Sequence, residues 1–413
     1  IAAILAPIVA LINIWAIPES ANWTVEFLGL ALQPVLNSSM GSLFAIVFCL
    51  MALIGGIFAY RIANTQELAA AYIYAGSAIC VTFAGDWITL FVFWELMAIG
   101  STIVIWSSNT ELAKAAALRY ILVHFFGGML LLGGIAGYSL EAGSLYIVSL
   151  DTNSLATWLI LAGILVNAGA PPLSAWIADS YPEASPSGAV FLSAFTTKTA
   201  VFVLIIVFPG APVLIPIGLF MIFYGIVYAL IENDMRRILA YSIVNQVGFM
   251  VTAIGIGTEM AINGAASHAF AHIIYKALLF MSAGAVLYKT GKRKCTDLGG
   301  LFRTMPITTF LGIIGVLTIA AFPFTSGFTT KSMIPEAAAN QDLIIVWFIL
   351  IAASAAVLLP DIKFPWFVFF QKDSGLRPSE APKNMLTAMT FSVELAKLKP
   401  ERADHHLEKI SKS

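Results

Sequence analysis

Residues 261–288 read AINGAASHAFAHIIYKALLFMSAGAVLY, and this stretch decides how the rest of the chain is interpreted. It exceeds the roughly 20 mostly apolar residues that a helix needs to cross a bilayer. His268, His272 and Lys276 interrupt it at intervals of four residues. Because residues four apart share one face of a helix, all three are predicted to line the same face. A charge at the bilayer centre costs at least about 2.5–3.5 kcal/mol, so this stripe indicates a function rather than an accident.

Composition makes a bilayer the solvent for most of the chain. Of its 413 residues, 59% are hydrophobic and only 11% are charged, whereas soluble domains carry roughly 25% charged residues. A net charge of -1 argues against a nucleic-acid-binding surface. The cysteines, Cys49, Cys80 and Cys295, lack the spacing of metal or redox sites. We therefore expect a membrane protein without a bound metal, cofactor or nucleic acid.

Apolar segments of similar length recur along the chain with short connections between them. Since a helical span needs about 20 apolar residues, we expect about twelve spans and an all-α, polytopic transmembrane helix bundle. The mixed segment 22–37 is predicted to be interfacial, and the chain becomes polar after about residue 389. The expected spans lie near 1–17, 42–62, 68–84, 87–106, 115–138, 155–178, 188–208, 213–231, 238–257, 261–288, 306–334 and 343–370.

Two of these spans are predicted to be broken. The sixth contains Pro171 and Pro172, and the eleventh contains Pro323 followed by Gly327. Proline removes a backbone donor and clashes with the preceding turn. In lipid the freed groups must be satisfied by protein or water, so broken helices tend to line cavities and mark ion sites in transporters. A tolerated kink is the alternative for either span alone.

Further ionisable residues lie inside the other spans. Glu95 is predicted at the middle of the fourth span and Lys198 at the middle of the seventh, while Lys331 follows the second break. An imidazole both donates and accepts protons, so the histidine stripe is suited to hand protons along a helix.

An unpaired buried charge costs more than a paired one, so we expect Glu95 and Lys198 to approach within a few ångströms, directly or through one water. Any one of these groups alone fits a buried ion pair or a hydrogen-bonded core histidine. Six of them, of both signs, are poorly explained by structure alone. Arg119 and His124 fit an interfacial position as well as a functional one.

Several motifs occur together in one order along the chain. They are APPLSAW at 170–176, YPEASP at 181–186, TKT at 197–199, NDMRRILAYS at 233–242, the stretch from His268 to KALLF at 276–280, and Gly327-Phe328 with Lys331. With these motifs the chain resembles the antiporter-like membrane subunits shared by respiratory complex I and the Mrp-type multisubunit cation/proton antiporters. The resemblance covers about residues 41–389. Residues 181–199 and 379–385 look most similar to the D-type member of the Mrp group.

The resemblance implies a role for each matching residue. Glu95 corresponds to the essential glutamate, and Lys198 to its paired lysine on the first broken helix. The stripe of His268, His272 and Lys276 corresponds to the central relay, and Lys331 to the terminal lysine on the second broken helix. Arg236 falls in a basic motif of the family. The implied fold has two inverted repeats of about five helices each, with two broken helices.

The chain also departs from the family pattern at both ends. The resemblance implies a further span before Ile1 and one or two more spans near the C-terminus. We therefore expect the chain to be truncated or incompletely represented. We divide it into an N-terminal span and interfacial segment at 1–40, an antiporter-like proton-translocating membrane domain at 41–389, and a polar tail at 390–413.

The resemblance implies a proton-translocating subunit of a multisubunit sodium or potassium/proton antiporter, multi-pass in the cell (inner) membrane. Its expected partners are other membrane subunits, protons, sodium or potassium ions and the lipid bilayer. One alternative is a proton-pumping subunit of complex I or a related hydrogenase, a translocase subunit whose redox chemistry lies on other chains. Another is a structural subunit that has lost transport. In none of these cases do we expect catalytic chemistry in this chain.

Overall fold

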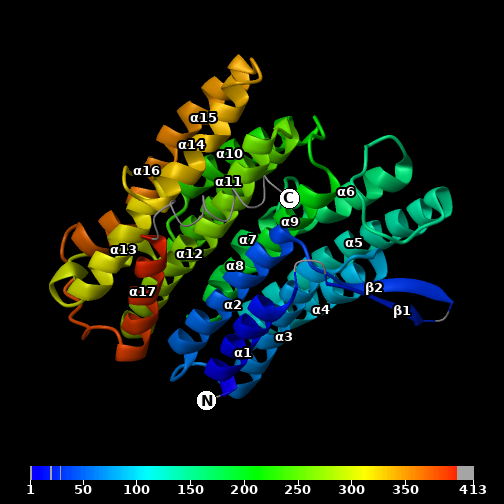
Figure 1. The fold of residues 1–413 in the computed structure, drawn as a ribbon. Helices are drawn as coiled ribbons and strands as arrows, with labels where there is room; N and C mark the ends of the chain where they lie inside the picture. Colours follow the sequence, from blue (N-terminus) through cyan, green and yellow to red (C-terminus); the bar gives the residue numbers. More distant parts are fainter. Residues whose placement is uncertain (1, 19–20, 28, 398–413) are drawn as a thin grey trace.

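The structure is a computed structural model that describes residues 2–18, 21–27 and 29–397. Helices lie side by side in a bundle, and one β-hairpin projects from its edge (Figure 1). The N-terminal helices form one side of the bundle, the C-terminal helices form the other, and the middle of the chain lies between them. The all-α bundle predicted from the apolar segments is therefore confirmed.

The helices coincide with the expected spans. Each of the twelve predicted segments falls on one helix or on a consecutive pair or triplet of helices. In the first half of the chain the elements are α1 (Ala2–Ala16), β1 (Asn22–Phe27), β2 (Leu30–Leu36), α2 (Ser39–Ala59), α3 (Thr65–Phe83), α4 (Trp87–Trp106), α5 (Glu111–Ala142), α6 (Leu155–Ala168), α7 (Ala175–Ser180), the 3-10 turn η1 (Tyr181–Glu183), α8 (Gly188–Ala194) and α9 (Thr196–Val207).

The second half is built in the same way. Its elements are α10 (Leu214–Ile231), α11 (Met235–Ile256), α12 (Glu259–Thr290), the 3-10 turns η2 (Cys295–Asp297) and η3 (Leu301–Arg303), α13 (Pro306–Ile319), α14 (Ser326–Ala339), α15 (Ile344–Ala356), α16 (Leu358–Pro365), the π-helical turn η4 (Trp366–Phe370) and α17 (Lys383–Ala396). Within the described residues, eight helical segments are long and apolar enough to cross a membrane, so the full count of about twelve crossings stays an expectation.

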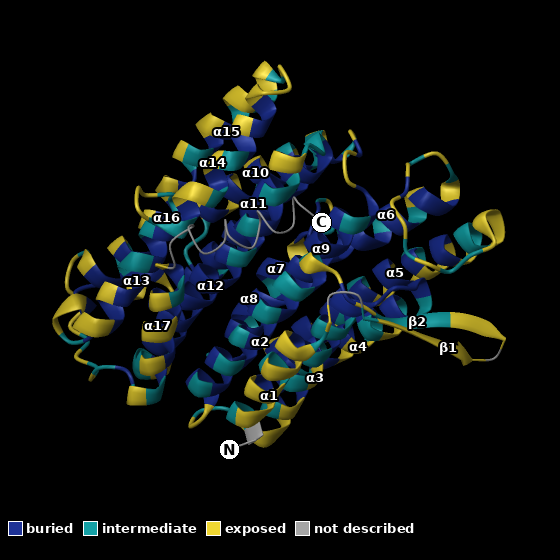
Figure 2. Ribbon diagram, in the orientation of Figure 1, coloured by how far each residue is buried: buried dark blue, intermediate teal, exposed yellow. Residues whose placement is uncertain are grey.

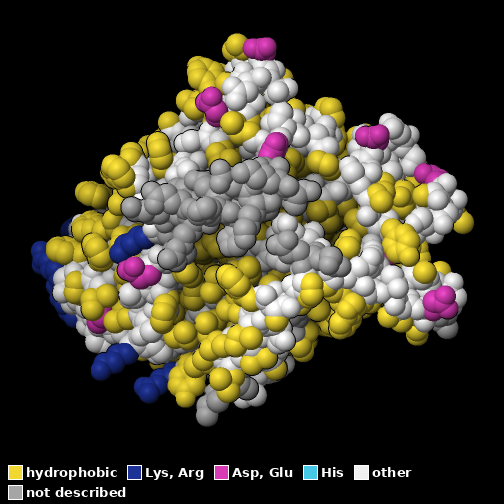
Figure 3. Space-filling model, viewed as in Figure 1, with side chains coloured by type: hydrophobic (Ala, Val, Ile, Leu, Met, Phe, Trp, Pro, Cys, Tyr) yellow, Lys and Arg dark blue, Asp and Glu magenta, His cyan; other side chains and the backbone are white. Residues whose placement is uncertain are grey.

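Burial separates central from peripheral helices. In the most apolar window of each helix, 94% of residues are buried in α11 and 89% in α12, against 39% in α5 and 28% in the α15–η4 segment. Figure 2 shows this contrast between the dark interior helices and the exposed outer ones. The outer helices turn apolar side chains outwards, and these cover much of the surface in Figure 3. Such a surface suits lipid, while the central helices have protein on every side.

Both proline-bearing interruptions predicted from the sequence are present. Helix α6 ends at Ala168, and Pro171 and Pro172 lie in the turn that precedes α7. Helix α13 ends at Ile319, and α14 begins only at Ser326, after Pro323. The structure adds a third interruption at Phe195, between α8 and α9, where no proline marks it. Lys198 follows this third break, not the one at Pro171-Pro172 with which the sequence associated it.

The two ends of the described chain differ from expectation in detail. Segment 22–37, predicted to be interfacial, contains an antiparallel hairpin of β1 and β2 that is joined to the bundle by the backbone N–H of Gln33, which donates to Asp86 at 2.8 Å. At the other end, α17 packs on α2 and α12, and Asn384 donates to the carbonyl of Phe58 at 2.9 Å. The expected boundary at residue 390 therefore falls inside a packed helix, and residues 398–413 lie outside the described part of the chain.

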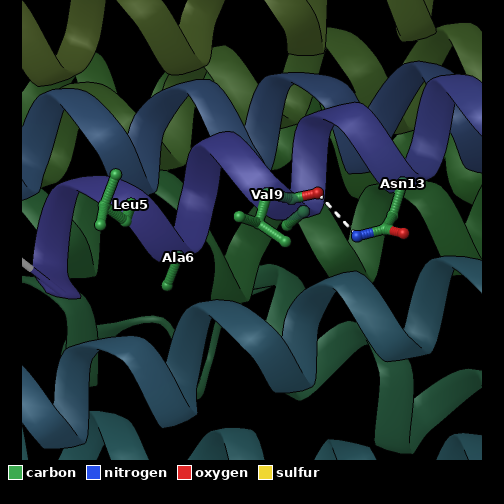
Figure 4. A pocket seen from close by; sticks show the side chains of 5 residues that line it. Leu5, Ala6, Val9 and Asn13 are labelled. Atoms are coloured by element: carbon green, nitrogen blue, oxygen red, sulfur yellow. Dashed lines mark hydrogen bonds between the residues drawn. The ribbon is translucent and has the colours of Figure 1, made fainter.

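The outer face of α1 carries a shallow, open hollow. Leu5, Ala6, Val9 and Asn13 line it together with Ala10 (Figure 4). The side-chain amide of Asn13 donates to the carbonyl of Val9 at 2.8 Å, so its polarity is satisfied within its own helix. The hollow is therefore lined mainly by apolar side chains, and none of its lining residues is charged.

Small residues set the distance between α10 and α11. A Cβ added at Gly218 would lie 2.5 Å from the backbone nitrogen of Thr252 and 2.6 Å from the carbonyl oxygen of Gly248. Close approach of this kind is how helices pack in lipid, where van der Waals contact replaces the hydrophobic effect. Because the opposing atoms are backbone, they cannot rotate away from an added methyl group.

We predict that Gly218→Ala lowers the thermal unfolding midpoint of the detergent-purified protein, at a cost of about 1–3 kcal/mol. The matched control is Gly133→Ala on α5, where an added Cβ meets no atom within 4 Å. The control is expected to leave the midpoint unchanged or slightly higher, because alanine has the better helix propensity. Equal midpoints for the two variants would contradict the close packing of α10 on α11.

Candidate functional site

Two buried lysines each bind the end of a broken helix. The ammonium of Lys198 on α9 donates to the carbonyl of Ser193, in the last turn of α8, at 2.6 Å. Lys331 on α14 donates to the carbonyl of Ile319, the last residue of α13, at 3.2 Å, and also lies 4.8 Å from the ring centroid of Phe249. The last carbonyls of a helix lack intrahelical partners and carry the negative end of its dipole. Each break therefore supplies a site for a cation inside the bundle.

The ionisable stripe on α12 faces the interior, as predicted. His268, His272 and Lys276 are all fully buried. The Nε2 atom of His268 lies 3.0 Å from Oε1 of Gln246, and its Nδ1 atom lies 3.1 Å from the hydroxyl of Thr330 on α14. Because the Gln246 amide nitrogen donates to Asn245, its oxygen is the acceptor, and His268 donates from Nε2. His268 thus connects α11, α12 and α14.

The other two members of the stripe have no protein partner. Within the described residues, neither the ring nitrogens of His272 nor the ammonium of Lys276 makes a hydrogen bond. The ring centroid of His272 lies 6.2 Å from that of His268 and 5.2 Å from that of Tyr275. The charges of Lys198, Lys276 and Lys331 all act on His272, so these groups lie within electrostatic range of one another.

Glu95 does not join this cluster directly. It is half-buried on α4, and the described residues contain no ion pair within 4.0 Å between Glu95 and any cation, Lys198 included. Its Oε1 atom faces Gly128 on α5, where a Cβ would collide with it. The expected direct contact of Glu95 with Lys198 is therefore wrong for this conformation. The physical reason is that Lys198 takes the helix-end carbonyl of Ser193 as its partner. A bridge through water stays a prediction.

A buried hydroxyl cluster beside Lys198 was not predicted from the sequence. The hydroxyl of Thr196 lies 2.6 Å from that of Tyr74 and 3.3 Å from that of Tyr120, which in turn donates to Ser101 at 2.9 Å. His124, for which an interfacial position was considered, is buried and stacked on Tyr120 with ring centroids 3.9 Å apart. The cluster joins α3, α4 and α5 to the start of α9.

Arg119 and Arg236 lie apart from the lysine cluster. Arg119 is exposed and pairs with Asp179 at 2.6 Å, as an interfacial residue would. The guanidinium of Arg236 is fully buried and donates to the carbonyls of Tyr181, Pro182, Ala184 and Ser185. These bonds hold the turn that precedes α8 in place. A part for Arg236 in proton transfer stays a prediction.

A buried carboxylate was also not predicted. Asp361 on α16 is 1% exposed and accepts a hydrogen bond from Ser242 on α11 at 3.0 Å. Its charge acts on Lys276, Lys331 and Tyr275. The sequence signal for Asp361 is an acid inside the apolar segment 343–370, which apolar length alone predicts as one uniform span. The described residues contain no group of three or more His, Cys, Asp or Glu side chains that could hold a metal ion.

Comparison with known families decides what kind of protein carries this arrangement. The family described as NADH:quinone oxidoreductase/Mrp antiporter, transmembrane, matches residues 84–357. The chain belongs to this family. The matched residues contain the broken helices α8–α9 and α13–α14, the stripe on α12, and both lysines at helix ends. The family resemblance drawn from the motifs is therefore confirmed.

Individual members of the family show the same similarity. The D-type subunit of a Na(+)/H(+) antiporter from Alkalihalophilus pseudofirmus is 30% identical, over 79% of this chain and 71% of that protein. Chain 5 of an NADH-ubiquinone oxidoreductase from Schizophyllum commune is 31% identical, over 64% of this chain and 40% of that protein. A chain of the Mrp complex from Dietzia sp. shares the fold, with a TM-score of 0.88 and 19% identity, over 96% of this chain and 88% of that one.

We predict that the hydroxyl of Thr196 stabilises the site. Thr196→Val would leave the buried hydroxyls of Tyr74 and Tyr120 short of a partner, at a cost of about 1–3 kcal/mol. The adjacent Thr197 is equally buried, but its hydroxyl has no partner among the described residues. Thr197→Val should therefore be neutral or stabilising. Thermal unfolding of both variants in detergent checks the difference, and a larger loss for Thr197→Val would refute it.

Proposed function

We propose that the chain is a proton-translocating subunit of a multisubunit monovalent cation/proton antiporter in the cell (inner) membrane. Family membership supports this, as does the similarity to the D-type antiporter subunit across most of the chain. The observation that carries the proposal is the cluster of buried ionisable groups on α9, α12 and α14. In the low-dielectric interior of a bundle such groups are costly, and they mark ion paths.

The proposed path runs through the centre of the bundle. Lys198 is the first carrier, and its proton passes to Lys276 and His272, which lie within electrostatic range. From there His268 connects the stripe to α14, where Thr330 bonds to it and Lys331 follows. His272 and Lys276 lack protein partners in the described chain, so a hydrating water or the moving proton itself would complete their hydrogen bonds.

In this proposal Glu95 controls the loading of Lys198. In the conformation described here, Lys198 is held by Ser193 and not by Glu95, which corresponds to the open form of the predicted pair. When the pair closes, the carboxylate stabilises the protonated lysine. When it opens, that stabilisation is lost and the proton moves towards α12. Gly128 leaves the room that the Glu95 carboxylate occupies.

The driving force would be the membrane potential together with the proton gradient. Moving one elementary charge across 100 mV is worth about 2.3 kcal/mol, so inward proton flow drives export of sodium or potassium if more protons enter than cations leave. The partners would be other membrane subunits, because a solved chain with this fold is part of a complex. The similarity to chain 5 of an oxidoreductase supports a second arrangement, in which redox chemistry on other subunits drives the same path.

We predict that Lys198→Ala and Glu95→Gln each abolish cation-dependent proton exchange without preventing assembly. The first change removes the carrier, and the second removes the charge that loads it. The measurement is dissipation of a pH gradient in membrane vesicles on addition of sodium or potassium, with the amount of assembled protein checked by immunoblot. Proteins that copurify with the chain distinguish an antiporter assembly from an oxidoreductase assembly.

Lys114→Ala is the matched control. Lys114 is a half-buried lysine near the start of α5, and its ion pair within the described residues is with Glu111 of its own helix, at 2.9 Å. A surface pair of this kind contributes about 1 kcal/mol or less, so exchange should continue at the wild-type rate. If Lys198→Ala assembles and exchanges as well as this control does, the proposed path is wrong.

A further inference from the structure

Asp361 is a buried acid for which the proposed path has so far no use. It lies on α16, which packs against α10, α11, α13 and α15. Its Oδ1 atom accepts from Ser242, whereas its Oδ2 atom has no hydrogen-bond partner among the described residues. A buried acid that served only to anchor α16 on α11 would be expected to have both oxygens satisfied. The free oxygen indicates that Asp361 interacts with something beyond Ser242.

The charged groups around Asp361 are two lysines of the proposed path. Lys276 on α12 and Lys331 on α14 both act on it electrostatically, and the phenol of Tyr275 is the other titratable group that senses its charge. Within the described residues, neither ammonium forms an ion pair with it within 4.0 Å. Helices α11, α12, α14 and α16 therefore bring one carboxylate near two ammonium groups, and it forms a direct ion pair with neither.

The two lysines depend on this carboxylate for compensation of their charge. Lys331 has the carbonyl of Ile319 and the ring of Phe249, whereas Lys276 has no hydrogen-bond partner in the described chain. No second carboxylate is among the groups that act on either lysine in that part of the chain. An uncompensated buried charge is far more costly than a compensated one, so Asp361 determines whether a proton can rest on Lys276 or Lys331.

We propose that Asp361 is a positioning residue, the shared counter-charge that holds the transported proton on Lys276 and Lys331 in the second half of the path. The inference rests on the proposed function and adds a residue to it. Because Asp361 contacts neither ammonium directly, it stabilises the protonated state of both lysines and leaves the proton free to pass between them. Ser242 fixes the carboxylate at this position.

Charge compensation tests this proposal without any transport measurement. Asp361→Asn keeps a hydrogen-bond acceptor for Ser242 but removes the charge, so we expect a lower thermal unfolding midpoint of the purified complex. Adding Lys331→Gln or Lys276→Gln to this variant should recover most of the loss, because the uncompensated ammonium is removed as well. The control combination is Asp361→Asn with Lys198→Gln, which should recover nothing, because Lys198 is not among the groups that act on Asp361.

A pH profile of exchange in vesicles provides the second readout. With Asp361→Asn the ammonium form of both lysines is less favoured, so the alkaline limb of the profile should move to lower pH by about one unit or more. Asp361→Glu restores the charge and should return the limb towards its wild-type position. A merely structural role would lower the yield of the complex without moving the limb.

The outcomes separate this inference from the proposed function. An unchanged midpoint and an unchanged pH limb in Asp361→Asn would overturn the inference, as would equal recovery by the Lys198→Gln control. If Asp361→Asn fails to assemble, failure of both lysine combinations to restore assembly would overturn it as well. Loss of the proposed function would appear instead as wild-type exchange in Lys198→Ala, while the recovery of stability by Lys331→Gln would still be observed.

Discussion

Holding a cation in an apolar bundle without an ion pair is the constraint on which the rest of this structure depends. Lys198 and Lys331 meet it in the same way, since each donates to a carbonyl at the end of an interrupted helix. Such carbonyls are available only where a helix stops inside the protein. The interruptions at Phe195 and at residues 320–325 are therefore the means by which the bundle accepts buried charge. They also explain why the lysines follow the breaks in the sequence so closely.

This constraint also explains which helices occupy the centre. Helices α11 and α12 carry buried polar and ionisable residues, yet in the most apolar window of each helix 94% and 89% of the residues are buried. Polar groups at lipid depth require protein partners, so these two helices must be enclosed, and the apolar α10 packs directly on α11. The glycine contact brings α10 close to α11. Helix packing and buried charge thus favour the same arrangement, with polar helices at the centre and apolar helices outside.

Local sequence patterns predicted the helical spans, two of the helix breaks and the inward face of α12. Apolar length indicated the spans, proline indicated two of the breaks, and four-residue spacing indicated the inward face of His268, His272 and Lys276. The break at Phe195 was missed because no proline or glycine marks it in the sequence, although the hydrogen bond from Lys198 to Ser193 spans it. Asp361 was missed because the lysines on which its charge acts lie on α12 and α14, which are distant in sequence and come near it only in the folded chain. The direct contact of Glu95 with Lys198 is absent from this conformation, in which the Ser193 carbonyl takes the same ammonium.

The balance of buried charge shows how the path would operate. Three lysines and two histidines lie within electrostatic range in the centre, and Asp361 is the fully buried carboxylate that acts on two of the lysines. Two unit charges about 6 Å apart repel by about 3 kcal/mol at an effective dielectric constant of about 20. The groups therefore cannot all carry a proton at once, and a proton that arrives at one lysine disfavours the charge on the next. A row of bases with too few counter-charges passes protons in sequence, because a proton on one base lowers the proton affinity of the next.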